Sequence, residues 1–217
     1  MESIIRWIKS SAIVRVVVGF ALAALLLYAL GWLVTGPYKG TVSGFDSNIR
    51  YFMRQIQSPM WTSLLLTVTK LGSTLLLAII GSVAGIAFIA LRWFRPLMLF
   101  IVTMIGQAVL HHGAKWLIAR PRPSALMAYR DVESSSFPSG HAVAALCMYG
   151  AIAWIVATRT ENAAAKFGIA AAAVILIFLI GMSRAYIGIH YPTDVVAGFI
   201  AAFIWTAAIM SLDRRPL

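Results

Sequence analysis

Long apolar stretches separated by short polar segments are the feature that most limits what this chain can fold into. The first runs for 22 residues, from Ile13 to Val34, and about 20 apolar residues let an α-helix cross the hydrocarbon core of a bilayer. Hydrophobic residues make up 61% of the chain and charged residues only 12%, so a water-soluble fold would lack the polar residues its surface requires. We therefore predict an all-α, polytopic integral membrane protein. An ordinary cytosolic enzyme, a disordered chain and a secreted disulfide-bonded domain are excluded.

Six transmembrane helices in a single membrane domain, residues 1–217, account for these stretches. The basic N-terminal segment is laid out like a signal peptide, but its apolar run exceeds the roughly 7–15 residues of a signal peptide. We therefore expect that run to remain as the first span. The expected spans are Ile13–Val34, Leu71–Leu91, Pro96–Ile118, His141–Thr158, Phe167–Met182 and Asp194–Leu212.

The segment between the first two spans is more polar and has the pattern of an interfacial helix. Its charged residues Asp46, Arg50 and Arg54 lie away from the apolar face, which favours a helix in the plane of the membrane surface. Ser58-Pro59 predicts the start of a short helix, Met60–Lys70, although Met60–Leu91 could also form one long tilted helix. The apolar residues that share one helical face are Phe45, Ile49, Phe52, Met53 and Ile56.

The net charge of +11, from 18 Lys and Arg against 7 Asp and Glu, has two interpretations. The basic residues can flank the spans on the cytoplasmic side and attract anionic lipid headgroups. Alternatively, they can form a site for an anionic substrate. Nucleic acid is excluded as a partner because the basic residues are scattered among apolar spans. With a cytoplasmic N-terminus nine cations fall on each side of the membrane. Setting aside four outer cations that belong to the candidate site leaves nine against five, which favours cytoplasmic N- and C-termini.

Three clusters of polar residues fall on one face of the membrane in this topology. They lie where the third and fifth spans end and where the fourth and sixth begin, and these four ends share one side. The clusters are Lys115 with Arg122-Pro123, Pro138 with Ser139-Gly140-His141, and Ser183-Arg184 with His190 and Asp194.

The clusters combine cations with groups that can react. Lys115, Arg122 and Arg184 suit phosphate oxygens, and a bound polyanion would relieve the cost of three cations near hydrocarbon. Snorkelling to lipid headgroups is the alternative explanation for them. Ser139 and Gly140 stand where a helix begins, which is either a plain cap or an anion site.

The histidines of these clusters suggest catalysis. Asp194 lies in the first turn of the sixth span, so its carboxylate can reach an imidazole N–H of His190. That contact would fix the tautomer and leave the other ring nitrogen free to attack a substrate or exchange protons. A single interfacial histidine can be structural, but a His–Asp pair beside His141 and three cations is better explained as a reactive site.

In these clusters the sequence resembles the type 2 phosphatidic acid phosphatase superfamily, which includes bacterial phosphatidylglycerophosphate and undecaprenyl pyrophosphate phosphatases. The patterns of that family are K-x6-RP, PSGH and SR-x5-H-x3-D. Here they read KWLIARPRP, FPSGH and SRAYIGIHYPTD, without departure at a signature position. The motifs span residues 115–194, and the six-span layout extends the resemblance to most of the chain.

The resemblance implies a role for each site residue. His190 would be the nucleophile that forms a phosphohistidine, Asp194 would orient it, and His141 would act as general acid and base. The remaining residues would hold the phosphoryl group, and they are Lys115, Arg122, Ser139, Gly140 and Arg184. The implied substrate is a membrane lipid phosphate, and no metal or other cofactor is implied.

Neighbouring residues leave several alternatives open. Arg120 could contact a second phosphate, a headgroup or a lipid phosphate, and His111 is expected to line the deeper wall of the site. His111 and His112 point to different helix faces, so we do not expect a metal there. Asp131 and Glu133 could serve loop solvation or repel a wrong substrate. Nothing in the sequence predicts an oligomeric state.

Three other activities compete with a phosphatase. A serine hydrolase is disfavoured because there is no G-x-S-x-G elbow, and a vanadate-dependent haloperoxidase because its known members are soluble. A lipid phosphate carrier would leave the histidines unused. A phosphotransferase with the same intermediate stays open. We expect a bacterial cytoplasmic (inner) membrane enzyme with its active site on the extracytoplasmic side and the interfacial segment Phe45–Lys70 gating lipid entry.

Overall fold

The computed structural model describes residues 2–123 and 135–213, with side chains described from residue 11 onward. Every regular element within these ranges is helical, which confirms the all-α class. In chain order the elements are α1 (Glu2–Thr35), α2 (Lys39–Gln55), α3 (Pro59–Lys70), α4 (Thr74–Ala90), α5 (Phe94–Ile118), α6 (Gly140–Ala145), the π-helical turn η1 (Leu146–Gly150), α7 (Ala151–Ala157), α8 (Ala163–Tyr186) and α9 (Pro192–Met210).

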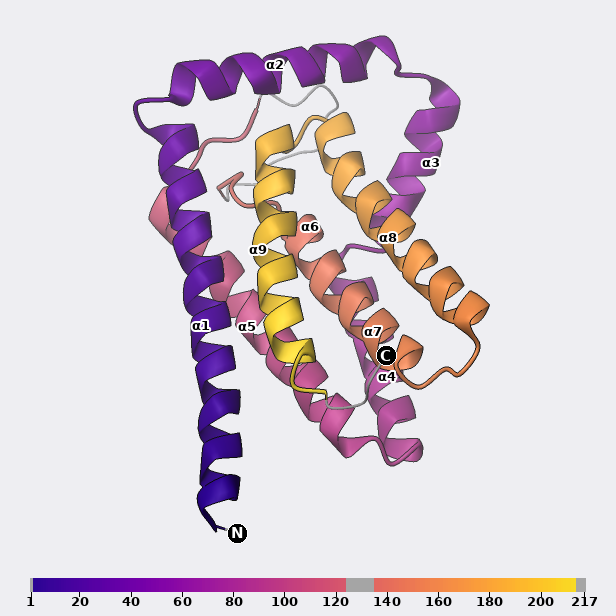
Figure 1. Cartoon of the computed structure of the whole chain (residues 1–217). Coiled ribbons are helices and arrows are strands. Elements are labelled where there is room, and N and C mark those ends of the chain that lie inside the picture. The colour runs from indigo at the N-terminus through magenta and orange to yellow at the C-terminus, as the bar shows by residue number, and fades with distance from the viewer. Residues whose placement is uncertain (1, 124–134, 214–217) are drawn as a thin grey trace.

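The helices form one bundle whose end is covered by α2 (Figure 1). α1 lies along α9, and α5 packs against both. The continuous unit α6–η1–α7 lies between α9 and α8. α2 runs crosswise over the bundle, and α3 descends from its far end beside α8. This is the arrangement expected of an interfacial helix that links the first two spans.

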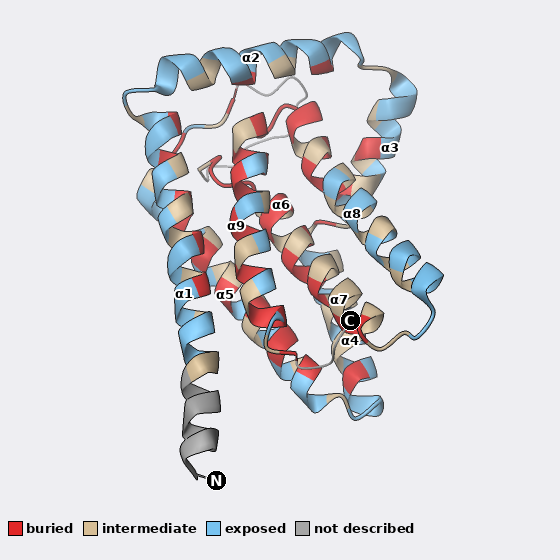
Figure 2. Cartoon of the chain, viewed as in Figure 1, coloured by how far each residue is buried: buried red, intermediate tan, exposed pale blue. Residues whose placement is uncertain are grey.

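The described residues contain five or six candidate membrane spans. Five single helices are long and apolar enough to cross a bilayer, and α3 with α4, bent by 52°, forms a sixth if the pair is one broken span. The outward faces are exposed (Figure 2) and carry large apolar side chains, such as Leu75 at 71% and Phe167 at 76% exposure. An apolar outer surface of this extent is suited to lipid rather than water. The single-helix spans are Ser11–Thr35, Phe94–Ile118, Gly140–Ala157, Ala163–Tyr186 and Pro192–Met210.

The break between α3 and α4 decides between the two alternatives for this region. α3 starts as predicted, with the Ser58 hydroxyl accepting from the Trp61 N–H at 3.3 Å and Pro59 as its first residue. The chain then breaks at Gly72, so the single long helix is wrong. A Cβ at Gly72 would lie 2.7 Å from Cδ2 of His141 and 2.6 Å from Cγ2 of Ile180. The break therefore brings the backbone against the candidate site.

α8 extends beyond both ends of the predicted span Phe167–Met182. It begins after Asn162, whose side chain accepts from the Ala165 N–H at 3.0 Å. Its last turn contains Arg184, which we expected in the following loop. This last turn packs inside the bundle rather than facing lipid: Ala185 and Tyr186 lie in a cluster with Met53 and Leu65, and Arg184 donates to the Thr69 hydroxyl.

α2 forms where the sequence predicts a helix, but only part of the predicted apolar face is buried. Met53 is buried, whereas Phe45 and Phe52 are 54% and 62% exposed. Asp46, expected away from the packed face, is only 1% exposed. The reason is an ion pair described below, which allows this carboxylate to enter the bundle and turns the phenylalanines outward.

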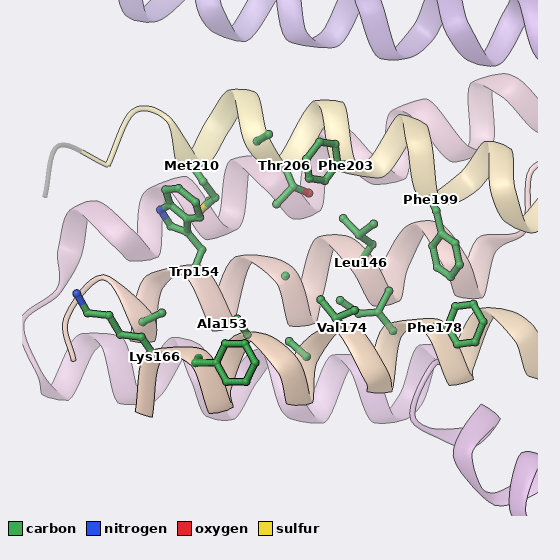
Figure 3. Close-up of a pocket in the computed structure, with 17 residues that line it drawn as sticks. Leu146, Ala153, Trp154, Lys166, Val174, Phe178, Phe199, Phe203, Thr206 and Met210 are labelled. Atoms are coloured by element: carbon green, nitrogen blue, oxygen red, sulfur yellow. The ribbon is translucent and has the colours of Figure 1, made fainter. Parts of the chain in front are cut away.

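A groove of about 750 Å³ opens between α7, α8 and α9 (Figure 3). Its walls are apolar and include Trp154, Phe178 and Phe203, with Lys166 at one end. None of the described residues that line it belongs to the three polar clusters. Its lining suits hydrocarbon, and the candidate chemistry lies elsewhere.

Candidate active site

The structure brings the three polar clusters together beneath α2. The segment after α5 and the segment before α6 are joined by the Ser136 N–H, which donates to the Arg120 carbonyl at 2.8 Å. The Ser139 N–H donates to the Asp194 carbonyl at 3.1 Å, which ties the start of α6 to the first turn of α9. The Ser136 carbonyl in turn contacts the His190 ring at 2.7 Å. Ser136 therefore connects all three clusters, and the sequence analysis did not single it out.

His190 has one ring nitrogen engaged by the protein and one beside a cation. Nδ1 lies 2.7 Å from the Ser136 carbonyl oxygen, which can only accept, so Nδ1 carries the proton. Nε2 then has a lone pair and accepts from Nη1 of Arg122 at 3.3 Å. The expected direct hydrogen bond from His190 to Asp194 is absent, because Nδ1 and Oδ2 are 3.6 Å apart. Asp194 acts on the ring through its charge.

Burial sets the protonation state of His190. The side chain is 3% exposed, and desolvation lowers its pKa below the usual value. Asp194 opposes this shift, whereas Arg122 and Arg184 add to it. The pKa of Arg122 is also lowered, chiefly by burial. Neutral His190, with its lone pair on Nε2, is thus the form present at neutral pH.

The three predicted cations are half-buried and each is oriented by an oxygen. Nζ of Lys115 donates to the Ser135 carbonyl at 2.9 Å, and Nη1 of Arg122 donates to the Ile189 carbonyl at 2.9 Å. Nη1 of Arg184 donates to the Thr69 hydroxyl at 3.0 Å. These three oxygens orient the cations toward the same part of the bundle. Such an arrangement favours a multiply charged anion.

Ser139 and Gly140 form the start of α6, as predicted. The Ser139 hydroxyl makes no capping bond, however, and its Oγ is buried without a hydrogen-bond partner among the described residues. A buried hydroxyl in that state is costly unless a ligand satisfies it. At Gly140 a Cβ would lie 2.8 Å from Cε1 of His111. His111 thus lies against the start of α6.

His141 is the second residue of α6 and is half-buried. Its ring lies against Gly72 and within electrostatic range of Arg184, His190 and Arg122. A second imidazole therefore shares the space bounded by the cations and by His190. This position suits proton exchange with a group held between them.

Arg120 occupies a position that differs from every interpretation the sequence suggested. Its side chain is 6% exposed, and it forms ion pairs with Asp46 at 2.8 Å and with Asp194 at 2.6 Å. Its guanidinium also lies 3.8 Å from the centroid of the Tyr191 ring. Asp46 is a residue that sequence reasoning missed. The available signal was that Asp46 is the only carboxylate between residues 3 and 130.

The described residues contain no group of three or more His, Cys, Asp or Glu placed to hold a metal ion. His112 is exposed and stacks edge-on against His111, with ring centroids 5.1 Å apart. Asp131 and Glu133 lie outside the described residues.

Comparison with known proteins identifies relatives of this chain. Phosphatidylglycerophosphatase B of Bacillus subtilis (strain 168) is 28% identical over 188 residues, which cover 84% of this chain and 90% of that protein. The crystal structure of the first transmembrane PAP2-type phosphatidylglycerolphosphate phosphatase from Bacillus subtilis matches with a TM-score of 0.79, covering 91% of this chain and 97% of that chain at 24% identity.

A second solved structure shares the fold. Aquifex aeolicus LpxE matches with a TM-score of 0.56 at 23% identity, over 76% of this chain and 93% of that one. Residues 96–216, more than half of the sequence, match the PAP2 superfamily. This chain is an integral membrane protein that belongs to the PAP2 superfamily.

Proposed function

We propose that the protein hydrolyses a phosphomonoester or pyrophosphate of a membrane lipid through a phosphohistidine at His190, without a metal ion. The observation that carries the proposal is the state of His190, with Nδ1–H bound to the Ser136 carbonyl and the Nε2 lone pair beside Arg122. An imidazole held in this way is a nucleophile next to a group that binds phosphoryl oxygen. As a PAP2 enzyme, the chain is a lipid phosphatase.

In the first step the Nε2 lone pair of His190 attacks phosphorus, and the bond from phosphorus to the leaving oxygen breaks. His141 donates a proton to that oxygen, so the lipid leaves as an alcohol or, from a pyrophosphate, as a monophosphate. Lys115, Arg122 and Arg184 offset the charge on the phosphoryl oxygens. The Ser139 hydroxyl and the Gly140 backbone complete the set of phosphate-binding groups.

In the second step water attacks the phosphohistidine. His141 accepts a proton from the water, the nitrogen–phosphorus bond breaks, and inorganic phosphate leaves. The electron pair returns to Nε2 of His190, which restores the starting enzyme. Asp194 favours both steps because its negative charge stabilises the imidazole ring while that ring carries positive charge.

The substrates supported best are phosphatidylglycerophosphate, undecaprenyl pyrophosphate and phosphatidate. The Bacillus subtilis relative, a phosphatidylglycerophosphatase by name, makes phosphatidylglycerophosphate the first to test. We place the enzyme in the bacterial cytoplasmic membrane, with both termini in the cytoplasm and the site on the outer side. The charge distribution supports this orientation.

Phosphate release from these three lipids by purified protein in detergent tests the proposal. EDTA is present throughout, and His190→Ala is the control. Release by the wild type alone is the expected result, and the lipid hydrolysed with the highest kcat/KM shows the substrate specificity. Dependence of release on added Mg²⁺ or Zn²⁺ would contradict the metal-independent mechanism. Transfer of phosphate to a lipid alcohol in place of water would identify a phosphotransferase.

The exposed apolar side chains of α2 give a prediction about lipid entry. Replacing Phe45 and Phe52 with serine is expected to lower kcat/KM for a long-chain lipid phosphate about tenfold, because two large side chains would no longer partition into the membrane interface. Hydrolysis of a short-chain phosphate is expected to stay within about twofold. Tyr51→Ser, on another face of α2, is the matched control. Equal losses on both substrates would contradict a gating role.

Gly72 gives a prediction about the placement of His141. Gly72→Ala is expected to displace the His141 ring, because the new Cβ would lie 2.7 Å from its Cδ2. A misplacement of about 1 Å can cost about 100-fold in rate. Gly113→Ala is the control, since a Cβ there meets nothing within 4 Å. Steady-state kinetics on both variants checks this, and an unaffected kcat in Gly72→Ala would show that the His141 position is not critical.

A further inference from the structure

A buried arginine, Arg120, joins the covering helix α2 to Asp194. Nη2 of Arg120 lies 2.8 Å from Oδ2 of Asp46 on α2, and Nη1 lies 2.6 Å from Oδ1 of Asp194 on α9. The side chains of the three residues are 6%, 1% and 0% exposed. One guanidinium group thus holds two carboxylates, each 74 positions away from Arg120 in the sequence.

Asp46 also binds the first turn of α9 directly. Its Oδ1 accepts from the Thr193 N–H at 3.0 Å, and its Oδ2 accepts from the Thr193 hydroxyl at 2.8 Å. The same hydroxyl accepts from Nη1 of Arg120 at 2.9 Å. Asp194 completes this network, since its Oδ2 accepts from the Tyr191 N–H at 2.9 Å. Both carboxylate oxygens of Asp194 are therefore fixed, and Oδ2 faces Nδ1 of His190.

Stability alone does not explain the network. Desolvating charges is costly, and a well-packed apolar group is often at least as stabilising as a buried ion pair. Two carboxylates share one arginine, so the network keeps an excess negative charge next to His190. Arrangements of this kind, where buried charges adjoin a reactive group, are typical of functional sites.

We propose that Asp46 and Arg120 are positioning residues for phosphoryl transfer, so that α2 is part of the catalytic unit rather than only a cover. Arg120 holds Asp194 against His190 and offsets part of its charge, and Asp46 holds Arg120 in place. This inference rests on the proposed role of His190 as nucleophile. Neither residue touches the phosphoryl group in this scheme.

The charges give the two residues opposite effects on His190. The groups that face His190 are Asp194 on α9, Arg122 after α5, Arg184 on α8, His111 on α5 and His141 on α6. Without Arg120 the charge of Asp194 is no longer offset, and the pKa of His190 rises. Without the charge of Asp46, Arg120 acts on Asp194 alone, and the pKa of His190 falls.

The test is the pH dependence of kcat/KM for wild type, Arg120→Gln and Asp46→Asn. Attack requires neutral His190, so activity declines as the pH falls through the pKa of His190. Arg120→Gln is expected to move this acid limb to higher pH by about one unit, and Asp46→Asn to move it to lower pH. Both are expected to lower kcat about 10- to 100-fold. Asp46→Glu, which keeps the charge, is expected to retain the wild-type limb.

The chain contains a matched control in a second buried pair. Arg159 and Asp213 are 2.8 Å apart, with side chains 6% and 3% exposed, beyond the opposite end of α9. Asp213→Asn removes a buried Arg–Asp ion pair that lies away from the site. It is therefore expected to lower Tm and to leave the pH profile of kcat/KM unchanged. Unshifted limbs in both Arg120→Gln and Asp46→Asn, with losses of Tm like that of Asp213→Asn, would overturn the proposal.

The outcomes separate this inference from the proposed function. If wild type releases phosphate and His190→Ala does not, while Asp46→Asn keeps the wild-type kcat and pH limb, only the positioning role is wrong. If His190→Ala keeps its activity, the proposed function itself fails. If Arg120→Gln does not fold, Asp46→Asn and Asp46→Glu still test the proposal. The proposal predicts a shifted acid limb for Asp46→Asn and an unshifted one for Asp46→Glu.

Discussion

His190→Ala is expected to lower phosphate release by about 10⁴-fold or more, because the reaction loses its nucleophile. The side chain is buried, but the imidazole makes a single strong contact to the protein backbone, at the Ser136 carbonyl. Loss of one such hydrogen bond costs about 1 kcal/mol, so the fold is expected to persist. Activity measured on a long-chain and on a short-chain phosphate checks the first expectation, and Tm the second.

His112→Ala is the control for this variant. His112 is exposed and lies outside the described site, so its loss is expected to leave activity within about twofold. Retention of near-normal turnover by His190→Ala, at wild-type Tm, would show that another group attacks phosphorus.

His141→Ala is expected to lower turnover of a lipid phosphate by about 10²- to 10⁴-fold, which is the range for loss of general acid–base catalysis. The two steps are affected differently. A lipid alkoxide leaves poorly without a proton, whereas p-nitrophenolate leaves without one. With p-nitrophenyl phosphate the first step is therefore expected to remain fast while hydrolysis of the phosphohistidine is slow.

A burst of p-nitrophenol, stoichiometric with enzyme and followed by slow release, is the expected record for His141→Ala. Rapid-quench measurements on wild type and on His112→Ala provide the comparison. An equal loss on the lipid and on p-nitrophenyl phosphate, with no burst, would mean that His141 does not protonate the leaving group.

Much of the fold could be predicted because the membrane imposes one simple rule. A stretch of about 20 apolar residues must be helical to satisfy its backbone in lipid, which identified the spans near Ile13–Val34 and Pro96–Ile118. The rule fails where a helix leaves lipid. α8 continues to Tyr186, where its last turn packs against Met53 and Leu65, and at the α3–α4 break Gly72 lies against His141 and Ile180, which are remote in sequence.

The candidate site, like the fold, could be predicted only in part. Motif spacing predicted that His190, Asp194 and the three cations lie close together, because each lies near the end of a predicted span, and the structure brings them together. It did not single out Asp46, since a carboxylate among basic residues on an interfacial helix is expected to face solvent. Nor could it show that Ser136, through its backbone carbonyl, takes the hydrogen bond expected of Asp194. Both depend on how distant segments pack.

The central claim, a covalent phosphohistidine on His190, is tested most directly by trapping it. Purified protein is mixed with ³²P-labelled lipid phosphate, quenched in base within milliseconds and analysed for protein-bound label. Phosphohistidine survives base and is lost in acid. The account predicts base-stable, acid-labile label in wild type and none in His190→Ala. Label that persists in His190→Ala, or active wild-type enzyme that never carries label, would contradict it.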